Sequence, residues 1–153
     1  MSNQSMSFKG VRLLVVDSDF DTRILLTYLF ELGGAEIITV ASATQAIEIM
    51  SFFKPDILIS DIYLPDEDGY SLLLKARNLE AKRGRKLPAI ALTTSPYEED
   101  RDMALSVGYD IYQCKPIDLD ELAFMVASLT GIDNRLEILG CNKAEASRQE
   151  SFN

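Results

Sequence analysis

Histidine is absent from this chain of 153 residues, and cysteine occurs only at Cys114 and Cys141. Without histidine the chain can form neither a Ser-His-Asp nor a Cys-His catalytic site, cannot ligate zinc through imidazole, and cannot phosphorylate itself on histidine. Two cysteines far apart in the sequence form neither a disulfide framework nor an all-cysteine zinc site. Their scarcity is typical of a reducing compartment, so we expect a cytoplasmic protein.

Positive charge and long apolar runs are also scarce. The chain has 15 Lys and Arg against 24 Asp and Glu, which gives a net charge of −9. Direct nucleic-acid binding is not expected, because it needs a basic face. The basic cluster at 82–86 is interpreted as a solvated loop around Gly84. No apolar run reaches the roughly 18–20 residues of a membrane span, and residues 1–10 lack the apolar core of a secretory signal.

Five short apolar segments are present, rich in Val, Ile, Leu or Tyr, and several of them are nearly continuous. Continuous apolar strands are typical of a parallel sheet that helices cover on both faces. The five predicted strands are residues 12–16, 36–40, 56–60, 89–93 and 109–114.

Segments with helical periodicity separate these strands. Ser42 and Asp118 each have the capping-box spacing that begins a helix. Ser95, followed by Pro96 and Glu98, predicts the start of another, which Gly108 ends. Strand and helix alternate five times, which predicts an α/β fold with a doubly wound parallel sheet. The periodicity fades after residue 131, so we expect a flexible tail over 132–153.

Polar residues follow four of the predicted strands directly. In a parallel sheet, ligands bind beyond the carboxyl ends of the strands. The residues expected at this edge are Asp17, Ser18 and Asp19 after the first strand, Asp61 after the third, Thr93 and Thr94 at the fourth, and Lys115 after the fifth.

This set of side chains suits phosphoryl transfer. Carboxylates packed together repel one another, and Mg²⁺ removes that penalty while it binds one or two carboxylates, waters and phosphate oxygens. Asp17 and Asp61 balance the charge of Mg²⁺, and Lys115 leaves one positive charge for an incoming phosphoryl group. An aspartate can act as the nucleophile. No GxxxxGK[ST] or GxGxxG loop is present to bind a nucleotide phosphate instead.

Each of these residues also has a purely structural interpretation. Asp and Thr at strand ends commonly cap turns or helices, so Asp61 or Thr93 alone indicates little. Asp19 and Asp21 can cap the first helix. Tyr112 is compatible with a place in the core. The evidence for a functional site is the joint placement of these residues at one edge.

Four segments resemble the receiver domain of bacterial two-component response regulators. They are LLVVDSD, PDILISDIYLPDEDG, PAIALTT and YQCKP, in the order and spacing of that family. The resemblance extends from about residue 11 to 129. It implies a flavodoxin-like sheet of order 2-1-3-4-5, a receiver domain over 8–131, and a Lys115–Pro116 bond that is usually cis.

The resemblance also implies a function in signal transduction. Asp61 would accept phosphate from a phosphohistidine on a sensor histidine kinase or a histidine phosphotransfer protein, with Lys115 paired to Asp61 and then to the phosphoryl group. The Thr93 hydroxyl would turn toward the phosphoryl group and Tyr112 would rotate inward. The face formed by residues 95–107, 109–114 and 118–129 would then change its affinity for a downstream protein. Dimerisation through the helices of this face is left open, and no enzyme activity beyond self-dephosphorylation is expected.

The Mg²⁺ site implied by the resemblance departs from the family pattern in this chain. The ligands would be Asp17, Asp61, the backbone carbonyl of Tyr63, and either Asp19 or Ser18. Because Ser18 stands where the family usually has a second acid, we expect weaker Mg²⁺ binding unless Asp19 replaces it. Tyr63 and Thr94 are bulky for their positions, and we expect them to slow hydrolysis of the phosphorylated aspartate.

Two alternatives remain open from the sequence. The chain can be a pseudo-receiver, an interaction module that works without phosphorylation because Ser18 impairs metal binding. It also resembles, through LLVVDSDFD, the acidic corner of haloacid-dehalogenase-type phosphatases, in which Asp17 would be the nucleophile and Asp19 the general acid. That second resemblance leaves Asp61 without a role.

Overall fold

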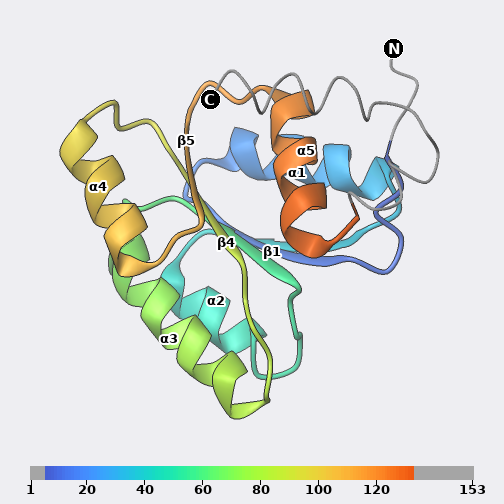
Figure 1. Cartoon of the computed structure of the whole chain (residues 1–153), viewed down its shortest axis with the longest axis horizontal. Coiled ribbons are helices and arrows are strands. Elements are labelled where there is room, and N and C mark those ends of the chain that lie inside the picture. Colours follow the sequence, from blue (N-terminus) through green and yellow to red (C-terminus); the bar gives the residue numbers. More distant parts are fainter. Residues whose placement is uncertain (1–5, 133–153) are drawn as a thin grey trace.

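The computed structural model describes residues 6–132 and places five parallel strands in one sheet. The order is β2-β1-β3-β4-β5, which confirms the predicted topology (Figure 1). The strands are β1 (Arg12–Val16), β2 (Glu36–Val40), β3 (Ile57–Ser60), β4 (Ala89–Thr93) and β5 (Ile111–Cys114). Two strands begin one or two residues later than the apolar segments predict, and the other three have the predicted bounds.

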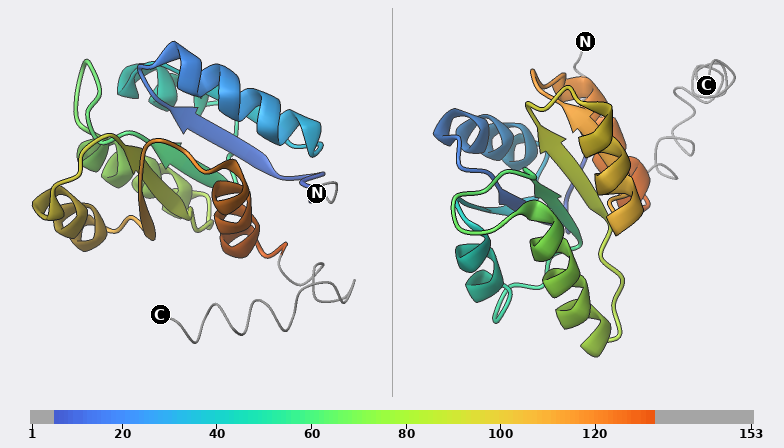
Figure 2. Two further views of the ribbon diagram at one scale, coloured as in Figure 1. Left: turned by 90° about the horizontal axis from the view of Figure 1, so that it is seen from above. Right: turned by 90° about the vertical axis from the view of Figure 1, so that its left-hand side faces the viewer.

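Within residues 6–132, five helices cover the sheet. They are α1 (Phe20–Leu32), α2 (Ala43–Ile49), α3 (Gly69–Lys82), α4 (Glu98–Val107) and α5 (Leu119–Thr130). Helices α1 and α5 lie together on one face, and Figure 2 shows α2 and α3 on the other side of the strands. Of these helices, all within residues 6–132, none is both long and apolar enough to span a membrane.

Two hydrophobic cores form because successive residues of a strand point to opposite faces of the sheet. Leu14 and Val16 of β1 belong to the core under α2, α3 and α4. Leu13 and Val15 belong to the core under α1 and α5. All four side chains are at most 1% exposed. Burial on both faces explains why the central strands β1, β3 and β4 are nearly continuous apolar runs in the sequence.

Two of the predicted helix starts are confirmed and one is wrong. The Ser42 side chain accepts a hydrogen bond from Gln45 N, and the Asp118 side chain accepts one from Glu121 N at 3.0 Å. Helix α4, however, begins at Glu98 with Tyr97 at the N-cap position, so Ser95 is not its cap.

The reason lies in the partners of the Ser95 backbone. The carbonyl oxygen of an N-cap residue accepts the first hydrogen bond of its helix. The Ser95 carbonyl accepts instead from the Tyr112 hydroxyl at 2.9 Å and from Cys114 Sγ at 3.2 Å, both on β5. These contacts hold Ser95 against the sheet, and the helix starts two residues after Pro96.

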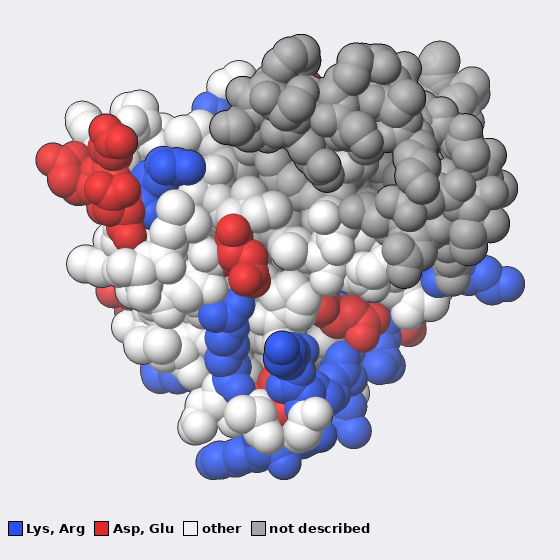
Figure 3. All heavy atoms as spheres, in the orientation of Figure 1, with Lys and Arg blue, Asp and Glu red and all other residues white. Residues whose placement is uncertain are grey.

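The interpretation of residues 82–86 as a solvated loop is wrong for its arginines. Arg83 Nη1 lies 2.6 Å from Glu80 Oε2, and Arg85 Nε lies 3.1 Å from Glu80 Oε1. Glu80 is fully buried, so both arginines neutralise an internal charge. Figure 3 shows Lys and Arg gathered over this α3–β4 connection and Asp and Glu over the start of α4. The predicted tail lies, apart from Ile132, outside the described residues.

Candidate functional site

The backbone places four predicted site residues at one edge of the sheet. Asp17, Asp61 and Lys115 directly follow β1, β3 and β5, and Thr93 is the last residue of β4. Pairing continues past the strand ends: Asp61 N donates to Val16 O at 2.9 Å, and Lys115 N donates to Thr93 O at 2.8 Å. Since all strands are parallel, the four side chains leave the sheet at its carboxyl edge.

The Lys115 ammonium group joins the two carboxylates. Its Nζ lies 2.9 Å from Asp17 Oδ2 and 3.6 Å from Asp61 Oδ2. The three side chains are 12%, 2% and 11% exposed, respectively. Three charged groups therefore meet at this edge of the sheet with little exposure to solvent, and we call this cluster the carboxylate pocket. The Lys115–Pro116 peptide bond is cis, as the family resemblance implies.

Asp17 carries an electrostatic penalty in this pocket. Burial raises the pKa of its carboxyl group above the ordinary value of 3.8, and the neighbouring Asp61 charge adds to the rise. Hydrogen bonds from Lys115 and from Asp19 N oppose it, the latter to Oδ1 at 2.9 Å. Oδ2 is fully buried and has the Lys115 ion pair but no hydrogen bond of good geometry. A further positive charge would therefore stabilise the ionised form.

The Asp61 carboxylate is held by a residue of the loop that follows β3. Tyr63 N donates to Asp61 Oδ1 at 3.1 Å. Gly69 packs against the Asp61–Ile62 backbone, where a Cβ atom would lie 2.8 Å from Ile62 Cα and closer still to the Asp61 carbonyl oxygen. Only glycine fits at this close approach, and Gly69 N closes the loop by donating to Ile62 O at 2.9 Å.

Thr93 and Tyr112 are linked through Ser95. The Thr93 side chain is fully buried, and its Oγ1 accepts from Ser95 N at 3.3 Å. The half-buried Tyr112 ring donates its hydroxyl to Ser95 O at 2.9 Å. The two residues expected to act in switching therefore share one intermediate residue. Their roles remain predictions.

Two carboxylates, rather than three, are available for a metal ion. Asp19 is exposed at the N-cap position of α1, and its Oδ2 accepts from the Thr22 hydroxyl at 2.7 Å. Ser18 is exposed. Over residues 6–132, no group of three or more His, Cys, Asp or Glu side chains is placed to hold a metal ion. Asp17 and Asp61 still fit Mg²⁺, which commonly uses one or two carboxylates and completes its shell with water and phosphate oxygens.

Sequence analysis missed the role of Asp100. The carboxylate of this residue, in the first turn of α4, accepts hydrogen bonds from the Ser95 hydroxyl and from the Tyr63 hydroxyl at 2.6 Å. Both bonds hold the pKa of Asp100 below its ordinary value, and the bond to Asp100 raises the pKa of Tyr63. An acidic residue at a helix start usually indicates an interaction with the helix dipole, so the sequence carried no signal for these partners.

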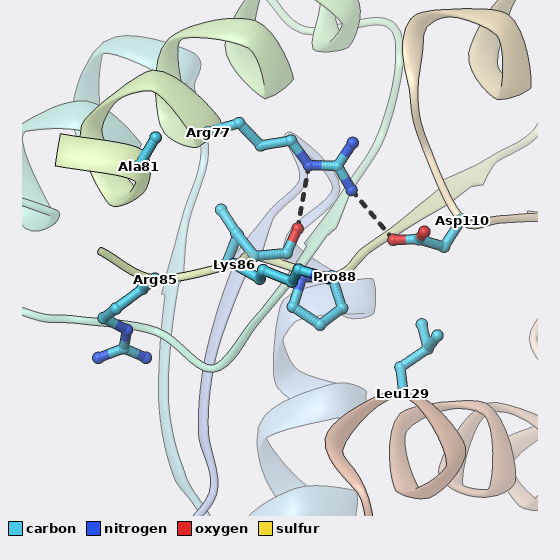
Figure 4. A pocket seen from close by; sticks show the side chains of 8 residues that line it. Arg77, Ala81, Arg85, Lys86, Pro88, Asp110 and Leu129 are labelled. Atoms are coloured by element: carbon cyan, nitrogen blue, oxygen red, sulfur yellow. Dashed lines mark hydrogen bonds and ion pairs between the residues drawn. The ribbon is translucent and has the colours of Figure 1, made fainter. Parts of the chain in front are cut away.

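A separate hollow of about 430 Å³ lies at the opposite edge of the sheet. Its lining includes residues immediately before β4 and β5, whereas the carboxylate pocket follows strand ends. Figure 4 shows the Arg77 side chain directed at a backbone carbonyl and at Asp110. Arg77 Nε donates to Leu87 O at 3.0 Å, and Nη2 donates to Asp110 Oδ2 at 3.0 Å. Its guanidinium group thus ties α3 to the starts of two strands.

Comparisons with known proteins agree with this geometry. Residues 13–127 match the family model of the response regulator receiver domain. An uncharacterized 14.6 kDa protein of Leptolyngbya boryana is 41% identical over 114 residues, which are 74% of this chain and 86% of that protein. The CheY-like receiver domain protein of Methanospirillum hungatei superposes with a TM-score of 0.72 at 25% identity, over 82% of this chain and 97% of that one.

Other curated relatives are much longer than the matched region. The response regulator Rre1 of Synechocystis is 34% identical over 78% of this chain and 51% of its own length. The hybrid signal transduction histidine kinase D of Dictyostelium discoideum is 32% identical over 78% of this chain but only 8% of its own length. The chain thus spans about half or less of these two relatives.

Proposed function

Because the chain belongs to the response regulator receiver family, we propose that Asp61 accepts a phosphoryl group from a phosphohistidine on a sensor histidine kinase or a histidine phosphotransfer protein. The observation that carries the proposal is the Lys115 ammonium group between the carboxylates of Asp17 and Asp61. The three groups sum to a charge of −1, and bound Mg²⁺ would bring the sum to +1, which suits an incoming phosphoryl group.

The transfer exchanges one bond for another. A carboxylate oxygen of Asp61 attacks phosphorus and forms an oxygen–phosphorus bond while the phosphorus–nitrogen bond of the donor breaks. The donor imidazole carries a proton on its other ring nitrogen, takes the electron pair of the broken bond, and leaves as neutral imidazole. Lys115 neutralises charge on the phosphoryl oxygens in the transition state. Burial of the pocket strengthens that interaction, since Lys115 is only 12% exposed.

Asp17 and Asp61 would hold Mg²⁺, together with the backbone carbonyl of Tyr63. When bound, Mg²⁺ neutralises the phosphoryl oxygens and relieves the repulsion between the two carboxylates. The buried Asp17 Oδ2, which has no hydrogen bond of good geometry, supports this assignment. Since Ser18 and Asp19 are both exposed and the Asp19 carboxylate accepts from the Thr22 hydroxyl, we expect the affinity for Mg²⁺ to be low for this family.

Phosphorylation of Asp61 would affect the rest of the protein through Thr93. In the proposal its hydroxyl turns toward the phosphoryl group, which removes the acceptor of Ser95 N, and Ser95 in turn holds Tyr112 on β5. The face of α4, β5 and α5 then shifts its affinity for a downstream protein. The protein would act as a cytoplasmic signalling switch, and its only chemistry would be acceptance and loss of this phosphate.

The test is phosphorylation of the whole chain by acetyl phosphate in Mg²⁺, followed by mass spectrometry. We expect one added phosphate on the wild type and none on Asp61→Asn. Asp102→Asn removes an exposed α4 carboxylate as a matched control and retains phosphorylation. A phosphate that persists in Asp61→Asn would refute the assignment of the acceptor.

A pseudo-receiver is the second candidate, favoured by the absence of a third acidic ligand among residues 6–132. It predicts no phosphate on the wild type at any Mg²⁺ concentration. The phosphatase alternative has no comparable support, because the family match is to the receiver domain. It predicts turnover of p-nitrophenyl phosphate that is lost in Asp17→Asn.

A further inference from the structure

One oxygen of Asp100 accepts two hydroxyl groups that come from different parts of the chain. The Tyr63 hydroxyl donates to Oδ2 at 2.6 Å across 37 positions of sequence, and the Ser95 hydroxyl donates to the same atom. Hydrogen bonds from hydroxyl groups to an ionised carboxylate are short and about twice as strong as neutral ones. Asp100 thereby ties the first turn of α4 to the loops that follow β3 and β4.

Tyr63 connects this carboxylate with the acceptor residue. Its backbone N–H donates to Asp61 Oδ1, while its hydroxyl donates to Asp100. The residue is 58% exposed, so packing contributes little to its position. The hydroxyl bond therefore decides where the ring lies, and the ring extends from the acceptor to α4.

Ser95 connects the same carboxylate with the two residues expected to act in switching. Its hydroxyl donates to Asp100, its N–H donates to Thr93 Oγ1, and its carbonyl accepts from Tyr112. Rotation of the Thr93 hydroxyl away from Ser95 N would remove one of these restraints on Ser95, and the Ser95 hydroxyl contacts Asp100.

We propose that Asp100 is a positioning residue that couples the phosphoacceptor pocket to α4 through the Tyr63 and Ser95 hydroxyl groups. The inference rests on the proposed function. In the unphosphorylated protein, Asp100 holds both hydroxyl groups and so fixes the start of α4 against the pocket. When Thr93 turns toward a phosphoryl group on Asp61, Ser95 shifts, the two hydroxyl bonds rearrange, and the start of α4 is released.

The test is NMR of the full chain labelled with ¹³Cζ-tyrosine at fixed pH, with the Tyr63 signal identified by its loss in Tyr63→Phe. Without ligand, Asp100→Ala should shift the Tyr63 signal. Asp102→Ala removes a charge from the same helix but should leave that signal in place. An unmoved Tyr63 signal in Asp100→Ala would overturn the proposal, because the ring would then not be held by Asp100.

Beryllofluoride with Mg²⁺ serves as the phosphoryl probe for the coupling itself. In the wild type it should shift the signals of both Tyr112 and Tyr63. In Asp100→Ala it should still shift Tyr112, but the shift of Tyr63 should be smaller than in the wild type, because only the backbone contact of Tyr63 with the pocket then remains. If beryllofluoride shifts the Tyr112 signal of the wild type but not the Tyr63 signal, the coupling is overturned and the proposed function is not.

A failure of the proposed function has a different signature in the same experiment. If no tyrosine responds to beryllofluoride in the wild type, the pocket does not bind the probe, and the proposed function and the coupling are both wrong. If the response persists in Asp61→Asn, the probe binds elsewhere and the acceptor assignment fails. The ligand-free comparison of Asp100→Ala with Asp102→Ala remains interpretable in both cases.

Discussion

Replacement of Asp17 by asparagine should stabilise the metal-free protein. Asp17 is only 1% exposed, and burial is the main reason why its pKa is raised above 3.8. A carboxyl group with a raised pKa binds its proton more tightly in the folded state, so the free energy of unfolding falls as pH rises from 3.8 through the folded-state pKa. Asparagine removes this penalty and retains one oxygen, which can accept from Asp19 N in the place of Oδ1, while its NH2 group takes the place of Oδ2 beside Lys115.

We expect a gain of about 0.5–2 kcal/mol at neutral pH, the range that single stabilising substitutions commonly reach. For a chain of this length, each kcal/mol raises the melting temperature by about 2–4 °C, so the gain is about 1–8 °C. The loss of the full ion pair with Lys115 opposes it, but Lys115 keeps Asp61 as a partner at 3.6 Å.

Mg²⁺ should reverse the order of stability. A ligand that binds only the folded state at 100 times its dissociation constant adds about 2.7 kcal/mol. Wild type, with both carboxylates, should therefore gain about 5–11 °C in melting temperature. Asp17→Asn has one carboxylate left and should respond only at much higher Mg²⁺ concentration. Thermal unfolding by circular dichroism, in EDTA and across a Mg²⁺ titration, measures both effects.

Two results would refute this reasoning. If Asp17→Asn is less stable than the wild type in EDTA at neutral pH, the Lys115 ion pair outweighs the desolvation of Asp17. If the two proteins respond equally to Mg²⁺, Asp17 is not a ligand. The difference in unfolding free energy should also grow as pH rises from 3.8, and a flat difference would contradict burial as its cause. Asp102→Asn serves as the control for the loss of one surface charge.

Two further predictions concern the remaining ionic contacts. Joint replacement of Arg83 and Arg85 by Met should cost about 3–5 kcal/mol in urea unfolding, because Glu80 is fully buried and would lose both cations. Glu80→Met should cost less, since the arginines are 24% and 27% exposed and can be hydrated; an equal or larger cost would contradict this. Asp66 accepts from the Thr44 hydroxyl and from backbone N–H groups at the start of α2, which lowers its pKa well below 3.8. Asp66→Ala should therefore lower the melting temperature above pH 3.8. The difference in melting temperature between the wild type and this variant should shrink as pH falls through the folded-state pKa of Asp66. A difference that persists in strong acid would exclude the carboxylate as its source.

The sheet and the carboxylate pocket could be predicted because both follow from strand positions. A continuous apolar strand ends where the first charged residue appears, as at Asp17 and Asp61, and parallel strands place these ends together. The approach of Lys115 to both carboxylates could therefore be predicted from the strand ends, without knowledge of how the side chains pack. The late starts of β3 and β5 are errors at strand beginnings, which do not affect the site.

The failures share one physical cause, which is the choice of a distant partner over a near one. Ser95 has good capping spacing, yet its carbonyl accepts from Tyr112 and its hydroxyl donates to Asp100. Arg83 and Arg85 lie in a loop that the sequence predicts to be solvated, yet both form ion pairs with the buried Glu80. Rules based on sequence spacing assign each polar group a partner that is near in the sequence. In the folded protein, the ends of strands and helices pack closely and bring more favourable partners from distant parts of the chain.

This contrast separates two parts of the proposed switch. The pocket depends on residues at strand ends, so any chain with the same strands and the same terminal residues would place Asp61 and Lys115 alike. The route from the pocket to α4 depends instead on hydroxyl groups that reach one carboxylate from separate loops. A change of Tyr63 or Ser95 would leave the fold and the acceptor intact but alter how α4 senses the phosphoryl group.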